Sequence, residues 1–385
     1  MLVTSVQAAG LTGRGGAAFP VHRKLSAVAQ AGRRRRPVVV GNGAEGEPAS
    51  SKDVTLLWQS PHLVLDGLQL AADATGARIA ALYLHRDARL RQHLTTALAE
   101  RAAAGTDRAP VQLIEAPRRF LSGEESALVS HVNGGPARPG YKEPPVYEKG
   151  VGGQPTLVQN VETLAHLALI GRYGPQWFRA VGTAGEPGSM LCTVQQPDGG
   201  RQVLEAALGT PLDWLLPLSG QVQAVLVGGY HGAWLPAAAA ARLSMCDAHL
   251  RPAGAAVGAG VLAALPADRC GLAETARVAR YLALESAGQC GPCLNGLPRV
   301  AAGLSALARP GCDPALLADL RRWAGLMAGR GACHHPDGSM RFVRSALTVF
   351  AAEIDGHIGG ACTARSREPF LPVPPEMPLD EADWR

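Results

Sequence analysis

The chain begins with short apolar runs that alternate with longer helical stretches, and this alternation constrains the fold most. The apolar runs have the length of strands and lie at residues 37–40, 79–83 and 111–114. The Ala- and Leu-rich stretches have the length of helices and lie at residues 63–74 and 90–104. Strands that alternate with helices in this way form a parallel sheet with helices on its faces. The sequence therefore predicts an α/β domain over residues 1–185.

Three further regions follow this domain. Residues 186–262 contain strand-like runs separated by Gly/Pro turns, which predicts a small β domain. Residues 263–362 predict an antiparallel four-helix bundle. Its helices are expected at residues 272–286, 297–307, 313–329 and 339–357. The proline-rich tail, residues 363–385, predicts an extended arm that is either disordered or bound to a partner.

Composition and charge exclude several classes of protein. The net charge is only +5 and aromatic residues make up 5% of the chain, which argues against a nucleic-acid-binding protein. No apolar stretch is long enough for a membrane span, and the first residues lack the pattern of a signal peptide. We therefore expect a cytoplasmic protein whose eight cysteines are not paired in disulfides.

Two segments offer groups for an anionic, hydroxyl-bearing ligand. The segment at residues 13–20 reads GRGGAAFP and is followed by Lys24, so it combines unhindered backbone N–H groups with two cations. Such glycines permit the close backbone approach that a phosphate requires. The segment at residues 42–48 reads NGAEGEP and follows a predicted strand, where α/β sheets bind ligands. A surface turn would explain either segment taken alone.

Two later segments are weaker when taken alone. Residues 120–128, FLSGEESAL, place paired acids after a glycine and before a predicted helix. Residues 153–163, GQPTLVQNVET, carry side-chain amides that suit the polar edge of a flavin ring. Helix capping would explain either segment. Their order along the chain is what is diagnostic.

Taken together, the four segments resemble the NADH-binding flavoprotein subunit of respiratory complex I and the related diaphorase subunits of NAD-dependent hydrogenases and formate dehydrogenases. The family pattern reads G-R-G-G-A-G-F-P, N-A-D-E-x-E-P, G-E-E-x-A-L and G-x-P-T-x-x-N-N-V-E-T. This chain supplies all four in order, although Ala44 replaces an aspartate and Gln159 an asparagine. The resemblance implies a Rossmann-like domain that binds FMN and NADH, and a β-grasp (SLBB-type) domain over residues 186–262.

The resemblance also implies roles for individual residues. Those expected to contact FMN are Gly13, Arg14, Gly15, Lys24, Asn42, Glu45, Gly123, Gln159 and Asn160. Those expected on the NADH side are Phe19, Glu47, Glu124 and Glu125. No side-chain acid or base is required, because hydride passes directly from the nicotinamide to the flavin.

The cysteines near the C-terminus resemble the family's iron–sulfur motif. The segment at residues 285–296 reads ESAGQCGPCLNG, which matches S-C-G-x-C-x-P-C except that Ala287 replaces the first cysteine. Together with Cys333, the cysteines Cys290 and Cys293 are implied to hold a [4Fe-4S] cluster. Other interpretations of the same residues are a zinc site completed by His334 or His335, a thiol redox pair, or a degenerate site without metal.

The fourth ligand of such a cluster must be local. The remaining cysteines of this region, Cys270, Cys312 and Cys362, are expected about a helix length away, at the other end of the bundle. Local candidates are His334, His335, Asp337, Ser286 and solvent. We predict a histidine ligand and select His334, with a [3Fe-4S] cluster on three cysteines as the competing interpretation.

The predicted activity is that of an NADH dehydrogenase (diaphorase). FMN would accept hydride from NADH, and the cluster would pass single electrons to a ferredoxin-like or other iron–sulfur partner in a multi-subunit oxidoreductase. Two alternatives remain open from the sequence. One is a non-catalytic flavin and iron–sulfur scaffold that docks redox partners, and the other is ferredoxin-driven reduction of NAD⁺.

Overall fold

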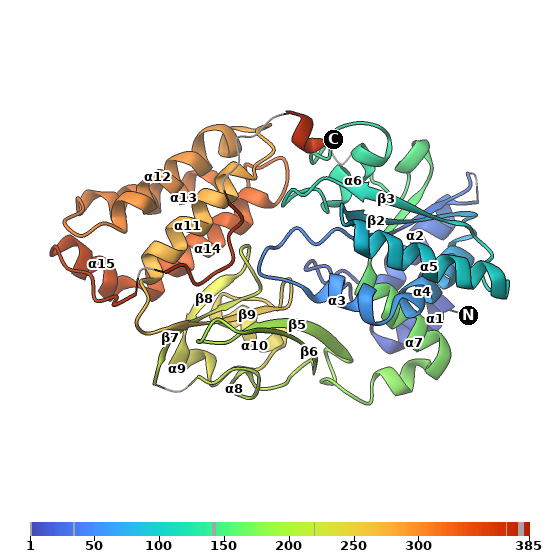
Figure 1. Cartoon of the computed structure of the whole chain (residues 1–385), viewed down its shortest axis with the longest axis horizontal. Coiled ribbons are helices and arrows are strands. Elements are labelled where there is room, and N and C mark those ends of the chain that lie inside the picture. The colour runs from blue at the N-terminus through green and yellow to red at the C-terminus, as the bar shows by residue number, and fades with distance from the viewer. Residues whose placement is uncertain (1, 34, 141–143, 219, 367, 376–380) are drawn as a thin grey trace. The chain divides into compact units, whose positions relative to one another are not determined.

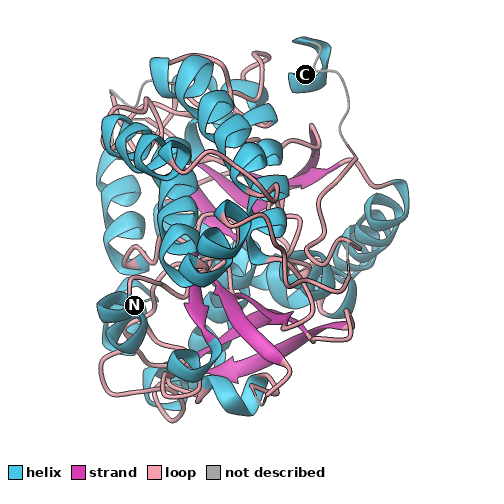
Figure 2. Cartoon of the chain, turned by 90° about the vertical axis from the view of Figure 1, so that its left-hand side faces the viewer, coloured by secondary structure: helices cyan, strands magenta, loops and turns pink. Residues whose placement is uncertain are grey.

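The computed structural model describes residues 2–33, 35–140, 144–218, 220–366, 368–375 and 381–385. The chain divides into two compact units. Unit 1 comprises Met1–Gly46, Ser51–Leu191 and Asp380–Arg385, and unit 2 comprises Glu47–Ser50 and Cys192–Leu379. Figure 2 shows helices and strands in both parts of the chain. Among the described residues, no helix combines the length and apolarity that a membrane span requires.

Unit 1 consists of a parallel sheet with helices on its faces. Its strands are β1 (Val38–Gly43), β2 (Ile79–His85), β3 (Val111–Ala116) and β4 (Thr156–Asn160). Its α-helices are α1 (Leu2–Ala9), α2 (Val21–Ala31), α3 (Lys52–Gln59), α4 (Pro61–Thr75), α5 (Ala88–Ala104), α6 (Glu125–Val132) and α7 (Val161–Phe178). Short 3₁₀ turns are η1 (Val151–Gly153) and η4 (Glu381–Trp384).

The order of the strands determines where a ligand can bind. The sheet runs β3-β2-β1-β4, and each neighbouring pair is parallel, which confirms the predicted α/β architecture. The chain proceeds outward from β1 to β3 and then returns to place β4 on the other side of β1. Connections therefore diverge at the carboxyl ends of β1 and β4. In open α/β sheets, this switch point is the usual ligand site.

The alternation of side chains along the strands separates two cores. Val39, Leu82 and Leu157 point into the larger core, which is completed by helices that include α1, α2, α4, α5 and α7. Val40 and Tyr83 point to the other face and pack near residues of α6. Both faces are thus covered, as a parallel sheet requires (Figure 1).

The last residues of the chain complete unit 1. Trp384 is 2% exposed, and its ring lies 4.7 Å from the Arg119 guanidinium and 5.1 Å from that of Arg138. The Trp384 carbonyl also accepts a hydrogen bond from the Ala137 N–H at 2.7 Å. Cation–π contacts from two guanidinium groups to one ring hold this end of the tail in place.

Unit 2 begins with a mixed five-stranded sheet in the order β6-β5-β9-β7-β8. β5 is parallel to β9, whereas β7 is antiparallel to both β8 and β9. The strands are β5 (Ser189–Gln195), β6 (Arg201–Ala207), β7 (Val222–Val227), β8 (Ala233–Pro236) and β9 (Val261–Pro266). The short helices are α8 (Leu212–Leu215), α9 (Ala237–Ala240), α10 (Asp247–Leu250) and η2 (Arg251–Ala253).

The helical part of unit 2 confirms the predicted bundle, with one difference. Its elements are α11 (Gly271–Leu284), the π-helical turn η3 (Pro292–Gly296), α12 (Leu297–Leu307), α13 (Ala315–Met327), α14 (His335–Val349) and α15 (Ala351–Ile358). Helices α11 to α14 pack side by side (Figure 1). The single fourth helix that we predicted is wrong, because the helix is interrupted at Phe350, where φ is −99° and ψ is 29°.

The tail also packs on unit 2 before residues 376–380, which, like residue 367, lie outside the described residues. The Glu274 carboxylate accepts hydrogen bonds from the N–H groups of Phe370 and Leu371, at 3.1 and 2.9 Å. The Phe370 carbonyl accepts one from Gln195 at 2.6 Å. This part of the tail has no regular secondary structure and binds its own chain, whereas the sequence predicted disorder or binding to a partner.

Candidate functional site

Three of the predicted flavin contacts lie together at the switch point of unit 1. In the parallel register, Asn42 at the end of β1 is paired with Asn160 at the end of β4, and Gly41 is paired with Gln159. All three amide side chains therefore belong to the carboxyl edge of the sheet, where its ligand is expected. The spacing of the motifs along the chain gave no information about this register.

The loops that follow β1 and β3 meet through two glycines. A Cβ atom on Gly46 would lie 2.2 Å from the Phe120 carbonyl oxygen, and one on Gly123 would lie 2.4 Å from the Ala44 carbonyl oxygen. The Asn42 side chain donates a hydrogen bond to the Gly123 carbonyl at 2.8 Å. These close approaches join the second and third motifs into one structure, and they explain why both contain glycine.

Substitution of Gly123 by alanine is therefore expected to destabilise unit 1 by about 1–3 kcal/mol, because the new methyl group meets backbone that cannot rotate away. The affinity of the protein for flavin should fall together with the stability of unit 1. The matched control is Gly185→Ala, since a Cβ atom there meets no atom within 4 Å. Urea denaturation and flavin titration of both variants measure the two effects. Equal stability of the two variants would contradict the contact between the loops.

The glycine loop lies at the start of α7. The Arg14 N–H donates to Thr163 Oγ1 at 2.8 Å, and a Cβ atom on Gly15 would lie 3.3 Å from the Asn160 Cβ. Within this loop, Ala18 has a φ of 50°, in the left-handed region where the family pattern has glycine. Phe19, which follows it, remains 52% exposed. The Gly13 N–H donates to the Phe19 carbonyl at 2.9 Å, which closes the loop.

Two predicted cofactor contacts also anchor the local structure. The Arg14 guanidinium is buried and donates to the Ser189 carbonyl at 3.0 Å. Lys24 Nζ donates to the Val158 carbonyl at 2.8 Å and lies 2.6 Å from Glu125 Oε1. Their contacts with FMN therefore stay predictions, because each cation already has partners on the protein.

Several predicted contacts act as helix caps. Glu45 accepts hydrogen bonds from the Lys52 and Asp53 N–H groups at the start of α3, at 3.0 and 3.3 Å. Glu124 accepts from the Ser126 N–H at the start of α6, at 2.9 Å. Asn160 likewise caps α7 by accepting from the Glu162 N–H at 3.0 Å. Capping, which the sequence left open for the segments of Glu124 and Asn160 but not for that of Glu45, is one role of all three side chains.

Glu47 differs from the other motif residues because it belongs to unit 2. Its Oε2 atom accepts a hydrogen bond from the Tyr230 N–H at 2.7 Å, and its Oε1 atom accepts one from the Ala49 N–H at 3.1 Å. A Cβ atom on Gly229 would lie 2.6 Å from this carboxylate. The proposed NADH role of Glu47 stays a prediction.

Sequence reasoning missed a buried ion network beside the switch point. Lys52 Nζ lies 2.6 Å from Asp53 Oδ1 and 2.9 Å from Glu162 Oε2, and all three side chains are at most 7% exposed. Asn160 Nδ2 donates to Asp53 Oδ2 at 2.6 Å. The adjacent acid and base at residues 52–53 were the available sequence feature, but only the fold places Glu162 against them.

The charged groups of this network shift one another's pKa values. Burial alone would raise the pKa of Glu162, but the Lys52 ammonium and His166 hold it at about 2. Burial would likewise lower the pKa of Lys52, yet the two carboxylates raise it above its usual value. Lys52 and Glu162 are therefore charged at neutral pH, whereas burial raises the pKa of Asp53, whose carboxylate holds the amide of Asn160 in place.

His85 is the last residue of β2 and lies near the residues that follow β1 and β3, at the same edge of the sheet. Its Nδ1–H donates to the Pro117 carbonyl at 2.9 Å, and its ring lies close to the backbone of Glu45 and Ala116. Burial lowers the pKa of His85 to about 4. The unfolded chain therefore binds a proton that the folded chain excludes between pH 6.5 and about 4.

The stability due to neutral His85 should thus be fully present above pH 6.5 and be lost as the pH falls toward 4. We expect His85→Gln to reduce this loss by roughly 2 kcal/mol, less than the full shift implies because the ring is only half-buried. Chemical denaturation at several pH values measures the difference. His62→Gln, at an exposed ring, is the control. Parallel curves for wild type and His85→Gln would contradict the assignment.

The residues at the switch point fit FMN. Gln159 is 5% exposed, and its Nε2 atom has no hydrogen-bond partner among the described residues. A buried amide left in this state costs about 1–3 kcal/mol, which a ligand acceptor would recover. Close approach of glycine backbone to Asn160 and the exposed ring of Phe19 add a phosphate-type loop and an aromatic surface.

The three motif cysteines lie at one end of the bundle in unit 2. Cys290 follows the end of α11, Cys293 lies in η3, and Cys333 precedes α14. In an antiparallel bundle, these element ends meet. Cys293 and Cys333 are buried, and so is Ala287, which occupies the position of the family's first ligand.

The environment of these thiols suits metal ligation. Burial opposes ionisation of Cys290, but hydrogen bonds from the backbone of Ala332 and Cys293 lower its pKa below the usual thiol value. Burial raises the pKa of Cys293 to about 12, and Cys290 acts in the same direction. A bound cation would reverse that second effect, because it stabilises both thiolates. The donor set therefore fits an iron–sulfur cluster.

A single zinc ion fits this site less well. Zinc bonds of about 2.3 Å place tetrahedral ligand atoms about 3.8 Å apart. In the described part of the chain, no three of Cys290, Cys293, Cys333 and His334 bring their ligand atoms within 4.8 Å of one another. A cluster distributes its ligands over several iron atoms, which permits the wider spacing.

The two histidines after Cys333 have different roles. His335 is 1% exposed, and its ring nitrogens lie 2.9 Å from His231 Nε2 and 2.8 Å from the Leu282 carbonyl. Both of its nitrogens are engaged, so His335 is excluded as the fourth ligand. His334 is exposed and occupies the N-cap position immediately before α14. Its ligation of a cluster stays a prediction.

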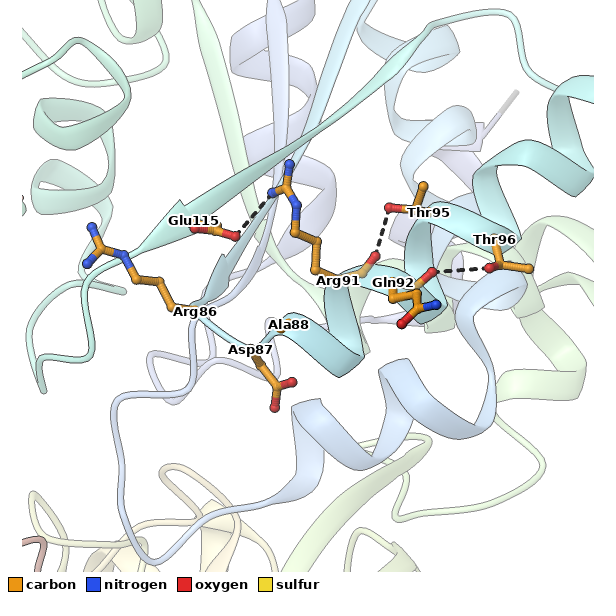
Figure 3. A pocket seen from close by; sticks show the side chains of 8 residues that line it. All are labelled: Arg86, Asp87, Ala88, Arg91, Gln92, Thr95, Thr96 and Glu115. Carbon is orange, nitrogen blue, oxygen red and sulfur yellow. Dashed lines mark hydrogen bonds and ion pairs between the residues drawn. The ribbon is translucent and has the colours of Figure 1, made fainter.

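A separate surface hollow in unit 1 contains none of the predicted site residues. The hollow has a volume of about 590 Å³ and lies at the start of α5, where Arg91 and Glu115 form an ion pair of 3.3 Å. Figure 3 shows the side chains that line it. The N-terminus of α5 is capped by Asp87, whose carboxylate accepts from the Arg89 N–H at 2.9 Å. The polar groups of this hollow are thus largely satisfied by one another.

Two family models match the chain, one in each unit. Residues 6–169 match the Nuo51 FMN-binding domain, a range that includes the glycine loop and the switch point. Residues 273–357 match the NADH-ubiquinone oxidoreductase-F iron-sulfur binding region, a range that includes the three motif cysteines. Each match thus coincides with one of the two sites described above.

Similar proteins cover nearly the whole chain. The F subunit of the NADH-quinone oxidoreductase of Salmonella typhimurium is 29% identical over 388 residues, 93% of this chain and 84% of that protein. Its counterpart in Streptomyces coelicolor is 28% identical over 378 residues, 93% of this chain and 83% of that protein. A chain of an NAD⁺-reducing [NiFe]-hydrogenase, crystallised in the H₂-reduced state, superposes with a TM-score of 0.84 at 29% identity. That match covers 93% of this chain but only 62% of the hydrogenase chain. The chain thus contains matches to an FMN-binding domain and to an iron–sulfur binding region, and it is similar over most of its length to F subunits of NADH-quinone oxidoreductases.

Proposed function

We propose that this chain is an NADH dehydrogenase of the diaphorase type, in which bound FMN accepts hydride from NADH and its electrons leave singly through an iron–sulfur cluster. The observation that carries this proposal is the set of amides and the glycine loop at the switch point of an FMN-binding domain. The three cysteines within the iron–sulfur region support the second half.

The residues of the chain bind and orient, and none is required to transfer a proton. Backbone N–H groups of the loop at Gly13 and Gly15 would bind phosphate, with Arg14 and Lys24 supplying positive charge. The side chains expected along the rest of the flavin are those of Asn42, Glu45, Gln159 and Asn160, together with the backbone of Gly123. NADH would bind beside Phe19, Glu47, Glu124 and Glu125. The cluster would be held by Cys290, Cys293, Cys333 and His334.

We assign the domains as residues 1–185 for FMN and NADH, 186–262 for an SLBB-type β-grasp, 263–362 for the cluster and 363–385 for the tail. The parallel pair β5 and β9 at the centre of the five-stranded sheet supports the β-grasp assignment. Relatives named as oxidoreductase and hydrogenase components support a role in a multi-subunit complex that passes electrons to a ferredoxin-like partner. We place this activity in the cytoplasm.

The visible spectrum of the purified protein tests the proposed activity. Flavin absorbance should bleach when NADH is added without oxygen, and an iron–sulfur acceptor should then be reduced. Bound flavin that does not bleach would overturn the enzymatic assignment and favour a scaffold that docks redox partners. Ala44, which replaces an aspartate and packs in the apolar core with Tyr83, is the observation that favours this second candidate.

A further inference from the structure

A second group of metal-type ligands lies outside the motif cysteines. The Sγ atoms of Cys270 and Cys362 and a ring nitrogen of His357 all lie within 4.8 Å of one another. Cys270 caps the start of α11, His357 lies in α15, and Cys362 follows that helix. Two of the three, Cys270 and Cys362, fall outside residues 273–357, the range of the iron–sulfur match.

This group is separate from the cluster site. Cys270 precedes α11 and Cys290 follows it, and the helix contains 14 residues. At 1.5 Å per residue, α11 places the two groups about 21 Å apart along the bundle. The α15 helix packs against α11 and α12 in unit 2, which keeps His357 at the Cys270 end.

The histidine is oriented as a metal ligand. His357 is 1% exposed, and its Nδ1 atom lies 3.1 Å from the Leu307 carbonyl oxygen. A carbonyl can only accept, so Nδ1 carries the proton and Nε2 keeps its lone pair. That Nε2 atom lies 3.8 Å from Cys270 Sγ. A backbone acceptor that fixes the tautomer of a ligating histidine is the common arrangement in zinc sites.

The thiols are positioned from two directions. Glu353 accepts from the Cys270 thiol at 3.3 Å and also from the Gly271 N–H at 3.3 Å, which holds Cys270 at the start of α11. The hydrogen bond from the thiol is lost when Cys270 gives up its proton to bind an ion, whereas that from the Gly271 N–H can remain. Cys362 is exposed and lies in a segment without regular structure. An ion held between Cys270 and Cys362 would therefore tie the end of α15 to the start of α11.

We propose that Cys270, His357 and Cys362 bind a Zn²⁺ ion, with the fourth position open to solvent beside the exposed Cys362. Two thiolates and a neutral imidazole are a donor set that suits zinc, and the two thiol protons leave to solvent when the ion binds. The ion would stabilise the end of the bundle opposite the cluster. This role is independent of flavin and NADH.

Zinc content of the full-length protein tests the site. Purified under reducing conditions and incubated with zinc, wild type should retain about one zinc per chain after gel filtration. Cys362→Ser should lose most of that zinc and keep its iron. Cys312→Ser is the matched control, because Cys312 is a half-buried cysteine that is not part of the group. Wild-type zinc retention in both Cys362→Ser and His357→Gln would overturn the proposal.

Substitution of zinc by cobalt provides a second measurement, which does not depend on the retention of zinc during gel filtration. Cobalt-loaded wild type should show a thiolate-to-cobalt charge-transfer band, which should weaken in Cys362→Ser because one thiolate is lost. Chelation should lower the melting temperature of wild type but not that of Cys362→Ser. Because Cys362 is exposed, its replacement by serine is not expected to disturb folding. A Cys270–Cys362 disulfide found by mass spectrometry in metal-free, freshly purified protein would overturn the proposal.

Discussion

Replacing Cys333 with serine is expected to remove most of the iron from the protein while leaving bound flavin in place. Cys333 is buried at the bundle end, and a serine hydroxyl is a poor substitute for a thiolate ligand. Because the flavin residues belong to unit 1 and Cys333 to unit 2, NADH should still bleach the flavin. Reduction of a one-electron, ferredoxin-like acceptor should fall to background.

Iron content, flavin absorbance and acceptor reduction are measured on the same preparation. Cys312→Ser is the control, since Cys312 lies in the connection between α12 and α13 and not in the motif. Full iron content in Cys333→Ser would remove this cysteine from the ligand set. Loss of flavin together with iron would indicate a general folding defect.

Two further variants, measured in the same experiment, test which group is the fourth ligand of the cluster. If His334 is a ligand, His334→Ala should change the electron paramagnetic resonance spectrum of the reduced cluster. Ala287→Cys should supply a thiolate and lower the reduction potential, because an imidazole ligand raises it. An unchanged spectrum in His334→Ala would leave the position to solvent or to a three-iron cluster.

Local patterns in the sequence predicted the α/β domain and the helical bundle. The apolar runs at residues 37–40, 79–83 and 111–114 correspond to β1, β2 and β3. The runs in β1 and β2 are apolar because most of their residues are buried, whereas β3 is a partly buried edge strand. The break at Phe350 was not predictable, since apolar residues continue across it at helical spacing. The order of the strands also requires tertiary contacts that no single segment encodes.

The motifs identified side chains but not their partners. Glu45 and Glu124 were predicted as ligand contacts, and the structure shows that both also cap helices. Such a dual role is invisible in a motif, because capping depends on where a helix begins. The sequence predicted Cys270 and Cys362 at the same end of the bundle, but it gave no sign that His357 joins them, because only the fold brings the three ligand atoms within 4.8 Å of one another.

Lys52→Met is expected to destabilise unit 1 by about 3–5 kcal/mol, because it leaves two carboxylates buried without a counter-charge. The side chains of Lys52, Asp53 and Glu162 are 3%, 7% and 2% exposed, so water cannot replace the ammonium group. Arg108→Met is the matched control. Its ion pair with Asp73 joins side chains that are 82% and 45% exposed, and its loss should cost about 0–1 kcal/mol.

Urea denaturation of the two variants measures this difference, and similar losses in both would contradict the buried network. Addition of Glu162→Gln to Lys52→Met should recover part of the stability, because it removes one of the two uncompensated charges.

The pKa of Glu162 is lowered to about 2 in the folded chain. Its contribution should therefore be complete above pH 4.5 and be lost as the pH falls toward 2, and this dependence should be absent in Glu162→Gln. Since Asp53 holds Asn160 at the switch point, flavin affinity should decline with Lys52→Met but not with Arg108→Met.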